Sequence, residues 1–126
     1  INNFQNEKIT IFNYSKQFFL TFDKYKKFVD YCNEFLKNKQ NRSVYVFGAS
    51  YNTQFLLSFG LNIAKIDGII DNCSDKHGHF LYGYDLKIFS PDVLSSSDSC
   101  VILKNGYYSD EIRDQLLKIN STLTIL

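Results

Sequence analysis

The sequence contains no methionine, few cysteines and almost no net charge. The missing methionine predicts a domain that was cut from, or processed out of, a longer protein. With 14 basic and 13 acidic residues the formal net charge is +1, so no global field attracts the chain to nucleic acid or to an anionic membrane surface. We therefore expect a local binding site, with neither nucleic acid nor a membrane as a partner.

The three cysteines, Cys32, Cys73 and Cys100, are odd in number and form no Cys-x-x-Cys pair. This pattern is typical of a reducing compartment. No apolar run reaches the roughly 18 residues that a membrane span needs, and the first residues lack the basic and apolar regions of a signal peptide. The expected location is the cytoplasm.

Apolar and aromatic residues are abundant and regularly spaced. They include 12 Phe and 9 Tyr, and 44% of the chain is hydrophobic. A chain of 126 residues supports one core but hardly two. We expect a single domain over residues 1–126, in which residues 1–42 form a lead-in and a helix and residues 43–126 form an α/β unit.

Residues 15–37 have the periodicity of an amphipathic helix. The apolar positions alternate between spacings of four and three, and they are Phe18, Phe22, Tyr25, Val29, Cys32 and Leu36. Phe19, Phe28 and Phe35 widen this apolar stripe. The width predicts packing against a sheet or a neighbouring domain rather than a simple coiled coil.

Three segments have the composition of buried strands, 43–47, 66–71 and 100–104, and residues 121–126 are expected to form a last strand. Helices are expected over 52–59, ended by Gly60, and from Ser109 onward. A short extended excursion and a helical turn opening at Ser90-Pro91 are expected within residues 72–94. The alternation predicts a three-layer α/β fold, a truncated Rossmann-like parallel sheet of four or five strands with an N-terminal amphipathic helix, usually in strand order 3-2-1-4-5.

Three polar loops should meet beyond the carboxyl ends of these strands, at 48–53, 71–78 and 105–108. Gly48 lets the backbone turn, and the N–H groups at the start of the following helix can receive a phosphate. The candidate substrate-binding residues are Gly48, Ala49, Ser50, Tyr51, Asn52, Asp71, Lys76, His77, Asn105 and Tyr107.

Simpler explanations exist for several of these candidates. The loop Gly-Ala-Ser-Tyr-Asn-Thr has only the first glycine of the dinucleotide fingerprint, which argues against bound NAD. Asp71 stands 23 residues after Gly48, where an acidic residue can bond a ribose hydroxyl, or can simply end a strand and start a turn. Lys76 and His77 could contact phosphate or sugar hydroxyls, or lie in a solvated loop.

Beyond the third buried strand, Asn105 and Tyr107 could contact a sugar or base, or form a turn with Gly106. Metal binding is not expected, because the potential zinc ligands match no standard spacing: Cys73, Asp75, His77 and His79. A nucleophilic Cys–His pair lacks an orienting partner, so no catalytic residue is predicted.

Three segments, in order, resemble the C-terminal domain of the S-adenosylmethionine-dependent sugar C-methyltransferases: FGASYNTQFLLSFGL, IDNCSDKHGHFLYGYDLKIFSPDVL and NGYYSDEI. The matching positions are Gly48-Ala49, Leu56-Leu57, Asp71, Lys76 with Gly78, Gly83, Ile88 with Ser90-Pro91 and Leu94, and Asn105 with Glu111-Ile112. The chain departs from the family pattern at Asn52-Thr53, at Tyr82-Gly83-Tyr84 and at Lys104. Related modules also resemble the nucleotide-sugar domains of sugar acyltransferases.

The resemblance implies a domain that helps to bind or enclose a nucleotide-linked sugar, with an upstream methyltransferase domain of the same chain as its partner. It implies S-adenosylmethionine as the methyl donor of the parent enzyme and no cofactor in this fragment. Since no stretch offers both a donor pocket and a general base, we expect the fragment alone to be inactive. The alternatives are a structural or interaction module with an empty crevice, and a nucleotide-sugar domain of a sugar acyltransferase.

Overall fold

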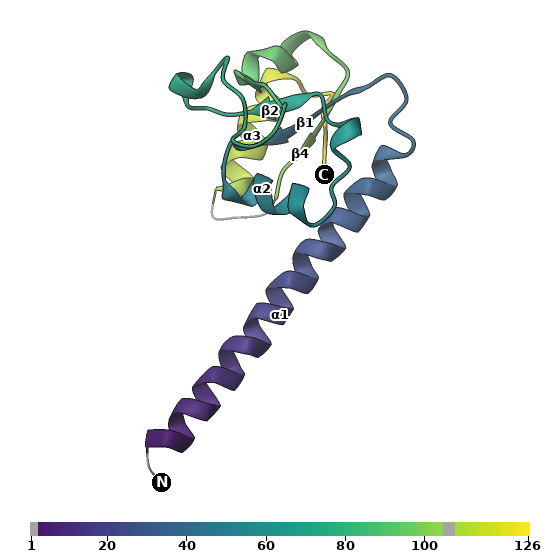
Figure 1. Ribbon diagram of the computed structural model, residues 1–126. Helices are drawn as coiled ribbons and strands as arrows, with labels where there is room; N and C mark the ends of the chain where they lie inside the picture. Colours follow the sequence, from purple (N-terminus) through teal and green to yellow (C-terminus); the bar gives the residue numbers. More distant parts are fainter. Residues whose placement is uncertain (1–2, 105–107) are drawn as a thin grey trace.

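The computed structural model describes residues 3–104 and 108–126 and consists of a long helix that projects from a small α/β domain (Figure 1). The long helix is α1 (Asn3–Leu36). The domain contains, in chain order, β1 (Ser43–Phe47), α2 (Tyr51–Ser58), β2 (Gly68–Ile70), β3 (Ile88–Phe89), β4 (Ser99–Ile102), α3 (Ser109–Ile119) and β5 (Thr124–Ile125). Short 3₁₀ helices connect them at η1 (Ile63–Lys65), η2 (Ser74–Lys76) and η3 (Pro91–Ser96).

The strands form one five-stranded sheet in the order β3-β2-β1-β4-β5, and all neighbouring pairs are parallel. This is the strand order that the sequence predicts. The register pairs Val46 with Ile69 and Val44 with Cys100. The expected excursion after β2 is a loop closed by an antiparallel bridge between Phe80 and Lys87, and it leads into β3.

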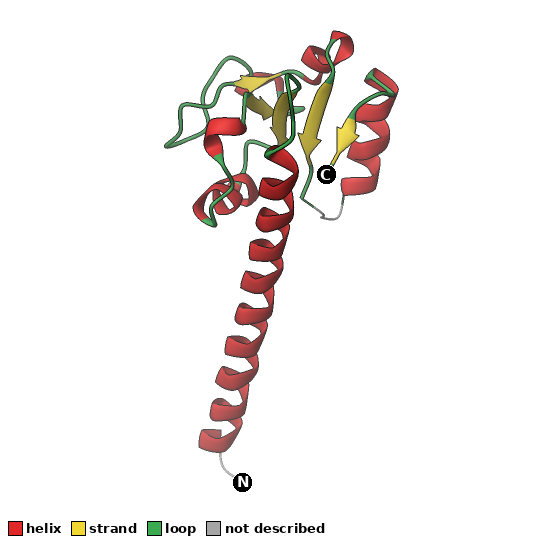
Figure 2. Ribbon diagram, turned by 90° about the vertical axis from the view of Figure 1, so that its right-hand side faces the viewer, coloured by secondary structure: helices red, strands yellow, loops and turns green. Residues whose placement is uncertain are grey.

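Helices cover both faces of the sheet, which confirms the three-layer arrangement. Val44 and Val46 of β1 face α1 and α2, where they join a core with Leu36 and Leu56. The alternate residue Tyr45 faces the other side, where the second core contains Leu94 of η3 and Leu116 of α3. In Figure 2, α3 accordingly lies on one side of the strands, and α2 lies on the other with the end of α1. The continuous apolar runs of the strands are explained by burial on both faces.

Helix α1 starts at Asn3, well before the predicted start at residue 15. The prediction was too short because it relied on apolar periodicity, whereas residues 1–42 contain no glycine or proline that would interrupt a helix. Only part of α1 packs on the domain. Residues 25–36, here the packed half, include the buried side chains of Val29, Cys32 and Leu36. Residues 14–22, the projecting half, run away from the domain, which they still contact at their end through Phe22 and Phe59 (Figure 1).

Polar contacts fix the packed half against α2 and the loop that follows it. The Asn33 side chain donates from Nδ2 to Gly60 O at 2.9 Å, and its Oδ1 accepts from the N–H of Asn62 at 2.8 Å. Tyr25 Oη donates to Asn52 Oδ1 at 2.8 Å. These contacts orient α1 on the same side of the molecule as α2. Although α1 is long, no helix in the described residues is sufficiently apolar over a sufficient length to cross a bilayer.

Candidate functional site

The loop between β1 and α2 is anchored to the end of β2. Gly48 has a φ of +102°, a conformation that residues with a side chain rarely adopt. Its N–H donates to Ile70 O at 2.7 Å, and the N–H of Ala49 donates to Asp71 Oδ2 at 2.8 Å. The tight turn predicted at Gly48 is therefore present, and it brings the first and second predicted loops into contact.

Asp71 connects the loops through both of its carboxylate oxygens. Oδ2 accepts from Ala49, and Oδ1 accepts from the N–H of Cys73 at 2.8 Å. The ammonium group of Lys76 lies 3.6 Å from Oδ2, and the Asp71 side chain is only 14% exposed. These contacts agree with the turn-forming explanation of Asp71. Its contact with a ribose hydroxyl stays a prediction.

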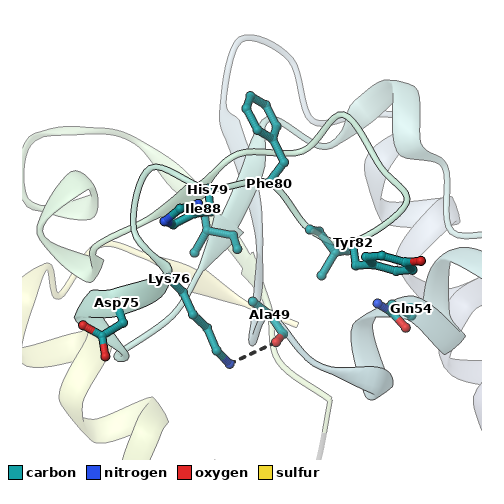
Figure 3. Close-up of a pocket in the computed structure, with 9 residues that line it drawn as sticks. Ala49, Gln54, Asp75, Lys76, His79, Phe80, Tyr82 and Ile88 are labelled. Atoms are coloured by element: carbon teal, nitrogen blue, oxygen red, sulfur yellow. Dashed lines mark hydrogen bonds between the residues drawn. The ribbon is translucent and has the colours of Figure 1, made fainter.

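Lys76 and His77 both turn back toward this junction. Lys76 Nζ donates to the carbonyl oxygen of Ala49 at 3.1 Å (Figure 3). His77 Nε2 lies 2.6 Å from the carbonyl oxygen of Asp71, and a carbonyl only accepts, so this ring nitrogen is the donor. An ammonium group has three donors. One donates to Ala49 O, and Asp71 Oδ2 at 3.6 Å is an ion-pair partner beyond hydrogen-bond distance, so donors remain for a ligand.

A hollow lies between the β1–α2 loop and the segment that follows β2 (Figure 3). It comprises two adjoining pockets of about 270 and 560 Å³, which share Ala49, Gln54, Lys76 and Tyr82. Ser50 and Tyr51 line the larger pocket. The smaller one is completed by Asp75, His79, Phe80, Leu81 and Ile88. We call the two pockets together the β2-side hollow.

Two lining residues of the β2-side hollow were not predicted as site residues. Tyr82 stands between the bridged residues Phe80 and Lys87 and is 89% exposed, and Gln54 lies in the second turn of α2. Figure 3 shows the two side chains on the same side of the hollow. The Tyr-Gly-Tyr turn was the available signal for Tyr82, since an exposed aromatic at a loop tip is a contact residue more often than a packing residue. Nothing in the local pattern distinguished Gln54.

A second hollow, of about 240 Å³, lies on the other side of the β1–α2 loop, where the strand order reverses between β1 and β4. Gly48, Ser50 and Asn52 line it from the β1 side, and Lys104 and Tyr108 line it from the β4 side. We call it the β4-side hollow. The candidates Asn105 and Tyr107 lie outside the described residues. Where the sequence predicted one shared cleft, the β1–α2 loop separates two hollows, and Ser50 contributes to both.

The start of α2 presents backbone N–H groups that have no hydrogen-bond partner among residues 3–104 and 108–126. The first N–H groups of an α-helix have no partner within the helix, and the N-cap residue Ser50 makes no side-chain capping bond. The N–H groups of Tyr51, Asn52 and Thr53 are in this position. Together with the ammonium group of Lys76, they make the mouth of the β2-side hollow suitable for an anion.

Metal-ligating side chains do not cluster. No group of three or more His, Cys, Asp or Glu residues within 3–104 and 108–126 is arranged to hold a metal ion. The cysteines are free: Cys73 is exposed, whereas Cys32 and Cys100 are buried. Burial raises the pKa of Cys32 to about 12 and that of Cys100 to about 11, so both thiols are neutral near physiological pH.

Comparison with known proteins gives one family. A model described as the C-methyltransferase C-terminal domain matches residues 4–123, which is nearly the whole chain. Neither a search of curated proteins nor a search of solved structures gave a significant match. The matched region includes almost all of α1, so the long helix is part of the family's domain and not an appendage of this chain.

Proposed function

The chain belongs to the family of C-methyltransferase C-terminal domains, and from this premise we propose that it binds a nucleotide-linked sugar in the β2-side hollow. Binding there would hold the sugar for the methyltransferase domain that such a C-terminal domain accompanies. The observation that supports the proposal is the combination of an anion-attracting loop with exposed aromatic rings around a single hollow. The family assignment favours the methyltransferase over the acyltransferase alternative.

The size of the β2-side hollow suits such a ligand. Small-molecule sites usually measure about 300–1,000 Å³, and the larger of the two adjoining pockets measures about 560 Å³. The hollow lies beyond the carboxyl end of β1, as ligand sites in open α/β sheets do. The proposal requires no rearrangement of the sheet.

The chemistry of the hollow supports a diphosphate linked to a ring. The N–H groups at the start of α2 and the remaining donors of Lys76 would bind the phosphate oxygens. The exposed rings of Tyr51 and Tyr82 would contact the base or the apolar face of the sugar. The amide of Gln54 can both donate to and accept from sugar hydroxyls.

In this arrangement Asp71 does not contact the ligand but positions the groups that do. Both of its oxygens already accept N–H groups of the protein, so it holds Ala49 and Lys76 where phosphate oxygens would meet them. His77, which donates to the backbone of Asp71, supports the same turn. A substitution at either residue would alter binding through the shape of the loops.

The β2-side hollow suits a diphosphate better than the reacting centre of S-adenosylmethionine. That centre is a sulfonium cation, which the ammonium group of Lys76 would repel. We assign the methyl donor to the upstream methyltransferase domain. By this proposal the 126-residue protein binds the sugar nucleotide and transfers no methyl group on its own.

The test is a titration of the protein with a uridine or thymidine diphosphate sugar, in which binding is monitored through the NMR chemical shifts of the backbone amides. Shifts should concentrate at residues 49–54, 71–77 and 82. Lys76→Met should weaken binding about tenfold, because a hydrogen bond to a charged group is lost. Lys65→Met is the matched control, since Lys65 is exposed on η1, outside the residues that line the hollow, and it should leave the affinity unchanged.

Two results would contradict the proposal. Shifts confined to the β4-side hollow would move the site to the other side of the β1–α2 loop. Absence of binding at millimolar ligand would favour the alternative, a structural or interaction module. Titration with inorganic diphosphate alone separates simple anion attraction from recognition of the whole ligand, because only the latter requires Tyr51 and Tyr82.

A further inference from the structure

The apolar face of α1 continues beyond the domain that covers it. Val29, Cys32 and Leu36 lie on this face and are buried. Continuing toward the N-terminus at the same helical spacing, the face is formed by Tyr14, Phe18 and Phe22, which are 70%, 65% and 43% exposed. The three rings therefore continue an established packing surface. Phe22 still contacts Phe59 of the domain, whereas Tyr14 and Phe18 have no covering element among the described residues.

This surface extends from α1 onto α2. The rings of Phe22 and Phe59 meet edge to face at 4.9 Å between centroids, and Tyr25 meets Phe55 at 6.1 Å. Phe55 is itself exposed. We call Tyr14, Phe18, Phe22, Phe55 and Phe59 the aromatic corner, because Phe22 meets Phe59 at the end of α2 and the stripe continues from Phe22 along α1 to Phe18 and Tyr14.

Two ion pairs form within α1 next to this surface. Lys26 binds Asp30 at 2.9 Å, and Lys27 binds Asp23 at 2.8 Å. In each pair the two opposite charges compensate one another, so neither pair leaves a net charge beside the aromatic corner. The partner of the aromatic corner is accordingly an apolar surface and not a charged one.

We propose that the aromatic corner docks against the methyltransferase domain that precedes this C-terminal domain in its parent chain. The family description supplies the partner, since a C-methyltransferase C-terminal domain follows a methyltransferase region. The exposed rings lie toward the N-terminal end of α1, which is the end that leads to that region. The proposal rests on the family and on this surface, and it does not depend on sugar binding.

The size of the corner favours a tethered domain over a second copy of the chain. A buried aromatic side chain covers about 150–250 Å², so the exposed rings offer on the order of 450 Å² together. Stable association of free partners usually needs about 800 Å² on each side. A domain linked through the same helix needs less, because the tether raises its effective concentration to the millimolar range.

Hydrogen–deuterium exchange of the parent chain, compared with the 126-residue protein, tests the proposal. Amides of residues 14–22 should exchange at least tenfold more slowly in the parent chain, because docking suppresses opening of the projecting half. The double substitution Tyr14→Ser with Phe18→Ser should abolish this difference. The matched control is Leu20→Ser with Tyr31→Ser, which removes two exposed apolar side chains from the opposite side of α1 and should preserve it.

Other outcomes would overturn the proposal. Equal exchange in the parent chain and the 126-residue protein would mean that nothing docks on the corner. If both double variants lost the slower exchange of residues 14–22, docking would not depend on which face of α1 carries the apolar side chains. Protection already present in the 126-residue protein, rising with its concentration and accompanied by a dimer mass in light scattering, would identify a second copy as the occupant. Melting curves of the isolated variants verify that each one folds.

Discussion

The packed half and the projecting half of α1 carry the same apolar pattern in different surroundings. In the packed half, Val29 and Cys32 lie on the sheet and are fully buried, whereas in the projecting half Tyr14 and Phe18 face solvent. A side chain contributes to folding only when another element removes it from water. The comparison teaches that one continuous stripe can serve two purposes, stability of the domain at one end and association at the other.

The largest expected effect is on the free energy of unfolding, which should fall much more when an apolar side chain is shortened in the packed half than in the projecting half. Leu36→Ala removes a side chain that is almost completely buried, so it should lower the free energy of unfolding by about 2–5 kcal/mol. Phe18→Ala should change it by less than about 0.5 kcal/mol, because Phe18 is mostly exposed. Urea unfolding of the 126-residue protein measures both. Comparable costs would mean that the projecting half packs on the domain in solution.

Long apolar segments made the sheet predictable from sequence. The run Ser43–Phe47 forms β1 with the expected bounds, and the alternation of strands and helices gave the strand order. The two-residue strand β3 had no such signal. Its pairing depends on tertiary packing, because a Cβ on Gly68 would come within 2.5 Å of the Phe89 ring. Only the bare glycine lets β2 and β3 approach in this way.

The next effect concerns the thiol of Cys32, which the packed half keeps out of water. The pKa values of Cys32 and Cys100 are raised in the folded protein to about 12 and 11. Above pH 9 the unfolded chain therefore loses these protons while the folded protein retains them, so stability falls as the pH rises. From neutral pH to pH 10 the loss should be about 3 kcal/mol, measured by urea unfolding under reducing conditions.

Two variants separate the thiols from other groups that titrate in this range. Cys32→Ala combined with Cys100→Ala should make the pH dependence shallower by about the same 3 kcal/mol. Phe18→Cys sharpens the comparison between the halves, since a thiol at this exposed position should react with a disulfide reagent at pH 8 while Cys32 stays unreactive. An unchanged pH dependence in the double alanine variant would refute the assignment to the thiols.

A moderate effect is expected at Asn33, which fixes the packed half by two hydrogen bonds. Asn33→Ala loses the bond to Gly60 O and the bond from the N–H of Asn62. At about 0.5–1.5 kcal/mol for each bond, unfolding should become easier by about 1–2 kcal/mol. Asn33→Asp keeps an acceptor for Asn62 and loses only the donor, so its cost should be smaller. Equal thermal midpoints for alanine and wild type would show that water replaces both bonds.

The candidate site was predictable in position but less so in its details. Strand order and the single turn glycine located the β1–α2 loop and its meeting with Asp71 and Lys76. The division into two hollows was not predictable, because it depends on how the side chains of that loop point. Gln54 was missed for a similar reason, since helical periodicity describes the buried face of α2 and says nothing about which polar residue borders a hollow.

The smallest effect tests the boundary between the two halves of α1. Lys104 Nζ, just beyond β4, lies 5.0 Å from the ring centre of Tyr25 and 5.7 Å from that of Phe28. Lys104→Met should cost about 0.5–1 kcal/mol of stability, because the cation–π attraction is lost while the aliphatic stem is retained. Lys104→Arg keeps the cation and should cost little, and Lys16→Met in the projecting half should change nothing. If methionine at position 104 were as stable as lysine in thermal unfolding, the packing of Tyr25 and Phe28 alone would hold this part of α1, and the boundary between the halves would be set entirely by apolar contact.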